Sequence, residues 1–134
     1  MRRPALLCAA AAALLLAACT LTYGTPTPPP TPDRPQVEFL APANNARFVE
    51  GAEIVVEIAA RDAGVGVARV VFQVDGLTVS EALPVVSGAV PVFAMRANWL
   101  ATGVGLHPLS AIAYRPDGLA SETAIVIVDV LPGG

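Results

Sequence analysis

The residues from Gln36 onward predict an all-β antiparallel domain, either a sandwich or a barrel. Short runs rich in β-branched residues alternate apolar with polar side chains, which is the period of two that a half-buried strand requires. Gly, Pro, Asn and Asp separate these runs at short intervals, and no helical period of apolar residues competes with them. The chain therefore indicates several short strands joined by turns.

The first strand is predicted at 37–39, and the turn-forming sequence Ala-Pro-Ala-Asn-Asn at 41–45 ends it. A second strand is predicted over 53–60, before a turn at 61–64. Alternation along this strand divides it into two faces. The side chains that we expect in the core are Ile54, Val56, Ile58 and Ala60.

A third strand is predicted over 67–74, and Asp75-Gly76 directly after it is typical of a tight hairpin turn. Its core-facing side chains are expected to be Val70, Phe72 and Val74. A weaker strand should follow at 77–80.

The pattern is less regular over 84–95 and predicts one strand near 90–95. Alternation returns over 107–114, where His107, Leu109, Ala111 and Ala113 form the inward set. The turn sequence Arg-Pro-Asp-Gly at 115–118 leads into a last strand over 122–130. Both faces of this last strand are apolar, so its register stays open.

The order of these pieces resembles bacterial immunoglobulin-like domains of extracellular proteins. The resemblance covers Pro35 to Leu131 and implies an immunoglobulin-like antiparallel β-sandwich of about seven strands, a module that serves in that family as spacer, adhesin segment or carbohydrate-associated domain. The cysteine pair and strand-C tryptophan of antibody domains are missing, so antibody-like recognition through loops is not implied. The pieces that carry the resemblance are Pro-x-Val near Gln36, Ala41-Pro42-Ala43-Asn44-Asn45, the run from Val67 to Gly76, Trp99, Gly105 to Leu109, Ala111-x-Ala113 and Asp117-Gly118.

The N-terminus predicts export and lipid attachment. Arg2 and Arg3 precede a short apolar segment, 5–18, which ends in small residues. The order Leu16-Ala17-Ala18-Cys19 resembles the bacterial lipobox, which implies cleavage before Cys19, diacylglycerol on its sulfur and usually an acylated N-terminus. The segment is shorter than the roughly 20 residues that span a bilayer, so we expect an anchored protein that does not cross the membrane. The alternative is an ordinary secretory signal with an incidental cysteine.

Four segments follow: a signal peptide at 1–18, a lipidated Cys with a Pro/Thr-rich linker at 19–35, the β-sandwich at 36–131 and a tail at 132–134. Proline removes backbone donors and fixes φ, so the linker is expected to run as polyproline II and to act as a stiff spacer. At about 3.1 Å per residue it would hold the domain well away from the lipid head groups. We expect the domain in the cell envelope, facing the periplasm or the cell exterior.

Composition disfavours several classes of function. Without the signal peptide, six Arg and no Lys remain against eleven Asp and Glu, so no nucleic-acid partner is expected. With Cys8 removed and Cys19 acylated, no thiol is left for a disulfide, a zinc site or a nucleophile, so the apolar core must hold the domain together. The chain has one histidine and no glycine-rich phosphate loop, and we predict no cofactor and no enzymatic activity.

Two pairs of polar side chains are candidates for a catalytic or metal site. His107 and Ser110 lie three positions apart on one strand and should point to opposite faces, so they do not suggest a hydrolase pair. Asp62 and Asp117 are expected on neighbouring turns at one end of the sandwich, where two carboxylates and turn carbonyls could bind Ca²⁺. Loop aspartates usually bond to their own turn instead, so we predict no metal and keep this pair as a weak calcium candidate.

One sheet face is apolar where it should meet water. The strands that begin near Val67, His107 and Glu122 are expected in one sheet, whose solvated face would normally alternate apolar with polar side chains. Patches of apolar side chains on a soluble domain tend to be contact surfaces, so this face is a possible interaction face. Its members are Val71, Ile112, Tyr114, Ile125 and Ile127.

The sequence thus predicts a lipid-anchored cell-envelope protein that presents a non-enzymatic immunoglobulin-like binding or structural module. Its expected partners are the membrane, through the anchor, and a protein, an envelope polymer or a second copy. The alternative is a carbohydrate-binding or adhesion module, which needs an exposed aromatic platform that Tyr114, Trp99 or Tyr23 would have to supply. An enzyme is the least expected class.

Overall fold

The computed structural model describes residues 24–28 and 33–134, and residues 33–134 belong to one compact unit. Residues 24–28 are exposed and form neither helix nor strand. The predicted signal peptide, Cys19 and most of the linker lie outside the described residues. In the part of the chain that is described, no helix is long and apolar enough to cross a membrane.

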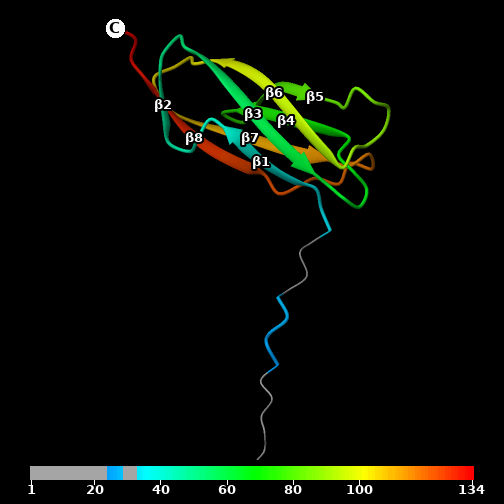
Figure 1. Cartoon of the computed structure of the whole chain (residues 1–134). Helices are drawn as coiled ribbons and strands as arrows, with labels where there is room; N and C mark the ends of the chain where they lie inside the picture. Colours follow the sequence, from blue (N-terminus) through cyan, green and yellow to red (C-terminus); the bar gives the residue numbers. More distant parts are fainter. Residues whose placement is uncertain (1–23, 29–32) are drawn as a thin grey trace, which may run out of the picture. The chain divides into compact units, whose positions relative to one another are not determined.

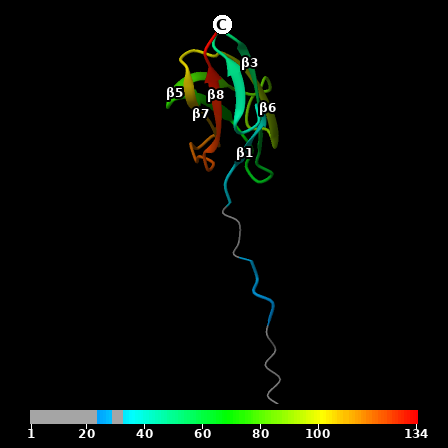
Figure 2. The ribbon, with the colours of Figure 1, turned by 90° about the vertical axis from the view of Figure 1, so that its left-hand side faces the viewer.

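Two sheets pack face to face in the described domain (Figures 1 and 2). One has the strand order β1-β3-β6 and the other the order β2-β8-β7-β4-β5. This architecture confirms the predicted immunoglobulin-like sandwich. The strands are β1 (Gln36–Ala41), β2 (Ala46–Val49), β3 (Glu53–Arg61), β4 (Arg69–Val74), β5 (Leu77–Ala82), β6 (Val92–Leu100), β7 (Gly105–Tyr114) and β8 (Ala124–Leu131).

The chain changes sheet between β1 and β2. β1 pairs antiparallel with β3, and after the cis Ala41–Pro42 bond β2 pairs parallel with β8 in the other sheet. The intervening turn is tied to β8, because the backbone N–H of Ile127 donates to Asn44 Oδ1 at 2.8 Å and the N–H of Asn45 donates to the Ile127 carbonyl at 2.7 Å. The sequence predicted this turn but not β2, since four residues show too little alternation to predict a strand.

The core lies between the sheets and contains the predicted residues of β3, β4 and β7. Phe72 is fully buried and meets the ring of Phe39 edge-on, with 6.4 Å between ring centroids. The open register of β8 is also settled, since Val128 and Val130 face the core while Ile125 and Ile127 face outward. The predicted core residues that are buried are Ile54, Val56, Ile58, Ala60, Val70, Phe72, Val74, Leu109, Ala111 and Ala113.

β6 is longer than the strand predicted near 90–95. It pairs with β3 over nine residues, from Arg61 opposite Val92 to Glu53 opposite Leu100. Trp99 therefore lies inside the strand, opposite Ile54, and packs against the core. Alanines along this segment weaken the apolar contrast in the sequence, so its alternation was not visible beyond Met95.

The chain enters the sandwich at one end and leaves it at the other (Figure 2). Gln36 pairs with Arg61 at the last residue of β3, whereas Leu131 pairs with Val49, just before β3 begins. We call the end with residues 33–35, 62–67 and 115–119 the entry end, and the end with 50–52, 75–76 and 101–104 the exit end.

Candidate functional site

The outer face of the five-stranded sheet is apolar along β7 and β8, which run side by side (Figure 1). Pro108 of β7 lies opposite Ile127 of β8, and both side chains point outward. Leu106 is 70% exposed and Ile125 is 60% exposed, although both are large aliphatic residues. Neighbours across a ladder share a face, so these side chains form one surface, in which Ser110 lies opposite Ile125 and Asp129 lies opposite Leu106 as polar members. We call it the β7–β8 strip, made of Leu106, Pro108, Ile112, Ile125 and Ile127.

The strip lacks two residues of the predicted interaction face and contains two others. Val71 does point to this face, opposite Ile112 and Glu81, but it is only 5% exposed because it lies on the central strand β4 between them. Tyr114 is half-buried, and the guanidinium carbon of Arg69 lies 3.8 Å from its ring centroid. The expected exposure of these two residues is therefore corrected, while Ile112, Ile125 and Ile127 remain part of the surface.

Leu106 and Pro108 were not among the predicted face residues. The predicted strand began at His107, whereas β7 begins at Gly105, so Leu106 falls within the strand and opposite Asp129. Extending the alternation by two positions toward the N-terminus would have found it.

The outer face of the three-stranded sheet has a different character. Arg61 forms an ion pair with Glu38 across β3 and β1, and Arg96 pairs with Glu57 across β6 and β3 at 2.9 Å. Large aliphatic side chains are exposed on this face too, but polar neighbours separate them: Asn98 lies opposite Val55, Arg61 opposite Val92 and Glu53 opposite Leu100. Leu40 of β1 is the fourth of these exposed aliphatic side chains. Charged pairs thus cross the middle of this face, as expected for a sheet surface in water.

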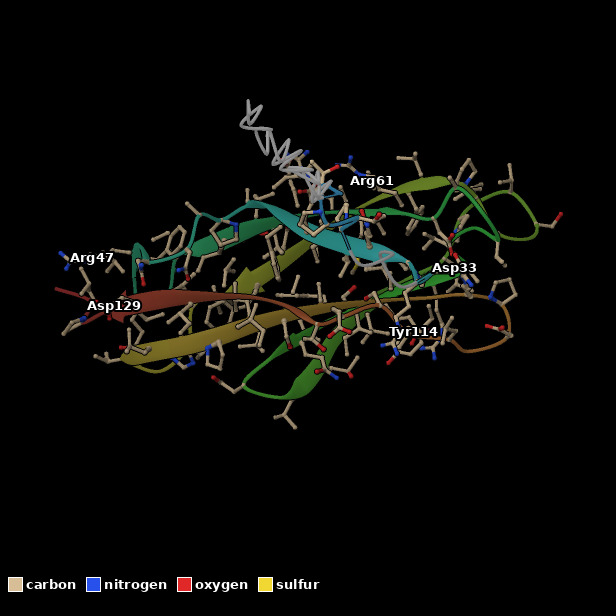
Figure 3. All side chains as sticks on the ribbon, turned by 90° about the horizontal axis from the view of Figure 1, so that it is seen from below. Asp33, Arg47, Arg61, Tyr114 and Asp129 are labelled. Carbon is tan, nitrogen blue, oxygen red and sulfur yellow. The ribbon has the colours of Figure 1, made fainter. Side chains whose placement is uncertain are left out.

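The charged side chains on the outer face of the five-stranded sheet occur in two pairs, one toward each margin, and Asp129 of the first pair lies opposite Leu106 of the strip. Arg47 of β2 is 3.9 Å from Asp129 of β8, and Figure 3 shows the two side by side at one end of the domain. On the other margin, Arg69 of β4 is 3.8 Å from Glu81 of β5. Exposed pairs of this length add little stability, typically about 0 to 1 kcal/mol. These pairs leave the surface beside the strip without net charge, because each charged side chain there has a partner of opposite sign.

A buried charge cluster occupies the entry end. Arg115 is buried, and its Nη2 donates to Asp62 Oδ1 at 3.1 Å and to Asp33 Oδ1 at 2.7 Å, while its Nε donates to Asp62 Oδ2. The backbone N–H groups of Gly64 and Val65 donate to the same Asp62 carboxylate. The hydrogen bond from Arg115 lowers the pKa of Asp62, against the opposing effect of burial. Sequence reasoning missed this cluster, since an Arg in a turn has no local signature of burial.

This cluster changes the interpretation of the weak calcium candidate. The Asp62 carboxylate is already bonded to a guanidinium and to two backbone donors. Asp117 Oδ1 accepts the backbone N–H of Leu119 at 2.9 Å, which is the turn-forming role usual for loop aspartates. Among the described residues, no three His, Cys, Asp or Glu side chains gather as a metal site would need. We therefore do not pursue a calcium site at these two residues.

His107 belongs to a second cluster, at the exit end. Its Nδ1 is 2.7 Å from Asp75 Oδ2, and its Nε2 is 2.6 Å from the carbonyl oxygen of Gly103. Trp99 meets the imidazole edge-on, with 5.4 Å between ring centroids. Both nitrogens face acceptors, so the imidazolium form is favoured, and first the Gly103 carbonyl and then Asp75 raise the pKa of His107. Ser110 lies on the other face of the sheet, as predicted, and donates to Gln73.

A comparison with known families agrees with this geometry. The model of the bacterial Ig domain family matches residues 35–107, more than half of the chain. The chain belongs to the bacterial Ig domain family. The matched region ends early in β7, and the remainder of β7 together with β8 completes the sandwich of this bacterial Ig domain.

Solved structures support the same fold. A fibronectin(III)-like module of CbhA from Clostridium thermocellum is 24% identical, with 74% of this chain and 100% of that chain covered and a TM-score of 0.57. The CARDB domain of PF1109 from Pyrococcus furiosus is 16% identical, with coverage of 74% and 97% and a TM-score of 0.57. Identities this low establish similarity of fold alone. No match is found among the curated proteins.

The aromatic side chains of this bacterial Ig domain do not form an open platform in the described part. Arg69 covers the ring of Tyr114, and Trp99 is half-buried against the core and His107. Tyr23, the third candidate, lies outside the described residues. A sugar-binding surface needs exposed ring faces, so the rings of Tyr114 and Trp99 do not support the carbohydrate-binding alternative.

Proposed function

We propose that this bacterial Ig domain is presented by a lipid-anchored cell-envelope protein and acts as a non-enzymatic module that binds a protein partner through the β7–β8 strip. The observation that carries the binding role is the contrast between the two outer faces. Charged pairs cross the middle of one face and separate its exposed aliphatic side chains, whereas on the other face Pro108, Ile125 and Ile127 adjoin one another and the two charged pairs lie beside them. Exposed patches of that kind tend to be contact surfaces.

The anchor rests on the sequence, through the Leu-Ala-Ala-Cys order at 16–19. The domain adds a feature suited to a tether. Asp33, at the end of the linker, bonds to the buried Arg115, and Pro35 is fully buried. Asp33 and Pro35, the last residues of the predicted linker, are thus fixed to the domain at its entry end.

The non-enzymatic role is supported by how the polar groups are used. Both nitrogens of His107 are occupied by an aspartate and a carbonyl, and Ser110 bonds to a glutamine on the opposite face. The carboxylate of Asp62 is held by Arg115. A nucleophile and its base need to be within hydrogen-bond reach of each other, and these candidates are not.

Intact-mass spectrometry of protein extracted from membranes tests the anchor. We predict a mature N-terminus at Cys19 that carries the mass of attached acyl groups. Cys19→Ala should leave the protein either unprocessed in the membrane or released as soluble material. A mature N-terminus at another residue, or an unmodified Cys19, would contradict the anchor.

A further inference from the structure

We propose that the partner of the β7–β8 strip is a second copy of this chain, packed face to face with both entry ends toward the same membrane. The inference rests on the proposed function, since the lipid anchor is what would confine two copies to one surface with one orientation. It deepens that function by naming the partner.

The charges around the strip suit self-association. A twofold interface sets one surface against itself, so any unpaired charge near the axis would meet a like charge. Here Arg47 is paired with Asp129 and Arg69 with Glu81, and β7 presents no charged side chain on this face. Without the signal peptide, six Arg against eleven Asp and Glu give the chain a formal charge of −5, so two copies repel each other on average. The strip is a surface where they can meet without burying an unpaired charge.

The position of the tether selects the orientation. β7 runs from the exit end at Gly105 to the entry end at Tyr114, so Ile112 lies near the entry end and Leu106 near the exit end. Cys19 precedes the entry end in the sequence of every copy, and in the proposed arrangement both copies have Ile112 nearer the membrane than Leu106. A twofold axis along the strands then places each strip residue at the same height as its counterpart, and sheets packed this way keep their strands within about 30° of each other.

This arrangement makes a prediction about distances. Leu106 and Ile112 are six positions apart on one strand, which corresponds to roughly 20 Å. With both copies pointing the same way, Leu106 faces Leu106 and Ile112 faces Ile112 across a sheet spacing of about 10 Å. With the copies pointing opposite ways, Leu106 of one copy instead faces Ile112 of the other.

Thiol cross-linking of the full chain in its own membranes tests the proposal. Leu106→Cys and Ile112→Cys, each expressed alone and treated with a short bis-maleimide, should both give covalent dimers. Val55→Cys on the other outer face is the matched control and should stay monomeric. Adding Ile125→Lys to the Leu106→Cys chain should reduce the dimer by at least about tenfold, because the lysine enters a symmetric interface twice. Val55→Lys should leave it unchanged.

Several outcomes would overturn the proposal. Monomers from both cysteine variants, with normal thermal unfolding, would show that no second copy covers the strip. Dimers formed only when the Leu106→Cys and Ile112→Cys chains are mixed would show opposite orientation, and cross-links to another protein alone would show a different partner. The unsubstituted chain is a separate control, since its only mature thiol is Cys19. Cross-linking there would show an unacylated Cys19 and contradict the anchor, whatever the strip variants do.

Discussion

Asp62 and Arg115 are the two charged side chains that are buried in the described part of the chain, and they bond to each other. A buried pair gains little net stability, because desolvation offsets most of the attraction. Loss of one partner is costly, because an uncompensated charge stays buried. Removing one partner should therefore destabilise the domain by more than the net stabilisation that the intact pair provides.

We predict that Asp62→Asn lowers the melting temperature by several degrees, and clearly more than Asp33→Asn does. Asp33 has a side chain that is 85% exposed, so water can replace its contact with Arg115. The double variant Asp62→Leu with Arg115→Met should be more stable than Asp62→Leu alone, because no buried charge remains. Thermal unfolding of the four variants checks this, and equal losses for Asp62→Asn and Asp33→Asn would contradict it.

His107 gives a pH-dependent prediction. Its pKa is raised above 6.5 in the folded domain, so its contribution to stability is complete below about pH 6.5 and is lost as the pH rises through the folded-state pKa. The free energy of unfolding should therefore fall from pH 6 upward. His107→Gln should remove this slope, since no other histidine is present to titrate there. A slope unchanged in the variant would assign it to another group.

A substitution of Phe72 on β4 tests the predicted register of that strand. Its ring is fully buried and touches Phe39 of the opposite sheet. Phe72→Ala should lower the free energy of unfolding by about 3 to 5 kcal/mol, measured by denaturant titration, because it removes contacts and leaves a cavity. A loss below about 1 kcal/mol would place the ring at the surface and shift the register of β4 by one residue.

Elements with clear alternation were predictable from the sequence. In β3 and β4 the side chains predicted to face inward are buried, and Val71 of the outward set of β4 is buried as well. In β7 the inward Leu109, Ala111 and Ala113 are buried, although its outward set is largely apolar too. β8 was not predictable in register, because both of its faces are apolar and only its pairing with β7 decides between them. Likewise β2 is defined by a parallel pairing with β8, which a four-residue segment cannot reveal alone.

For single residues of the candidate site, the sequence again predicted what depends on one strand and missed what depends on neighbouring strands. Ile112 was assigned to the outer face from the alternation of its own strand, which needs only local information, whereas the face of Ile125 and Ile127 is decided by the pairing of β8 with β7. The burial of Val71 and the covering of Tyr114 depend on side chains from neighbouring strands, Glu81 and Arg69. The Arg115–Asp62 pair joins turns 53 residues apart in sequence, so no local pattern announces it.

For the whole molecule, the domain is held together by one apolar core between its sheets, with no cysteine between residues 33 and 134. The outer surfaces of the two sheets differ in how their charged and apolar side chains are arranged. One is crossed by the Glu38–Arg61 and Glu57–Arg96 pairs and suits contact with water, whereas the strip on the other is suited to cover by protein. The central claim is that the strip is covered when the protein is in its membrane.

Carbene footprinting of the lipidated protein, first in its own membranes and then after dilution into detergent, tests this claim most directly. We predict that Leu106, Ile125 and Ile127 are labelled weakly in the membrane and strongly after dilution. Leu40, Val55 and Leu100 on the three-stranded sheet should be labelled equally in both states. Equal labelling of the strip in the two states would show that it faces water in the envelope and would contradict the account.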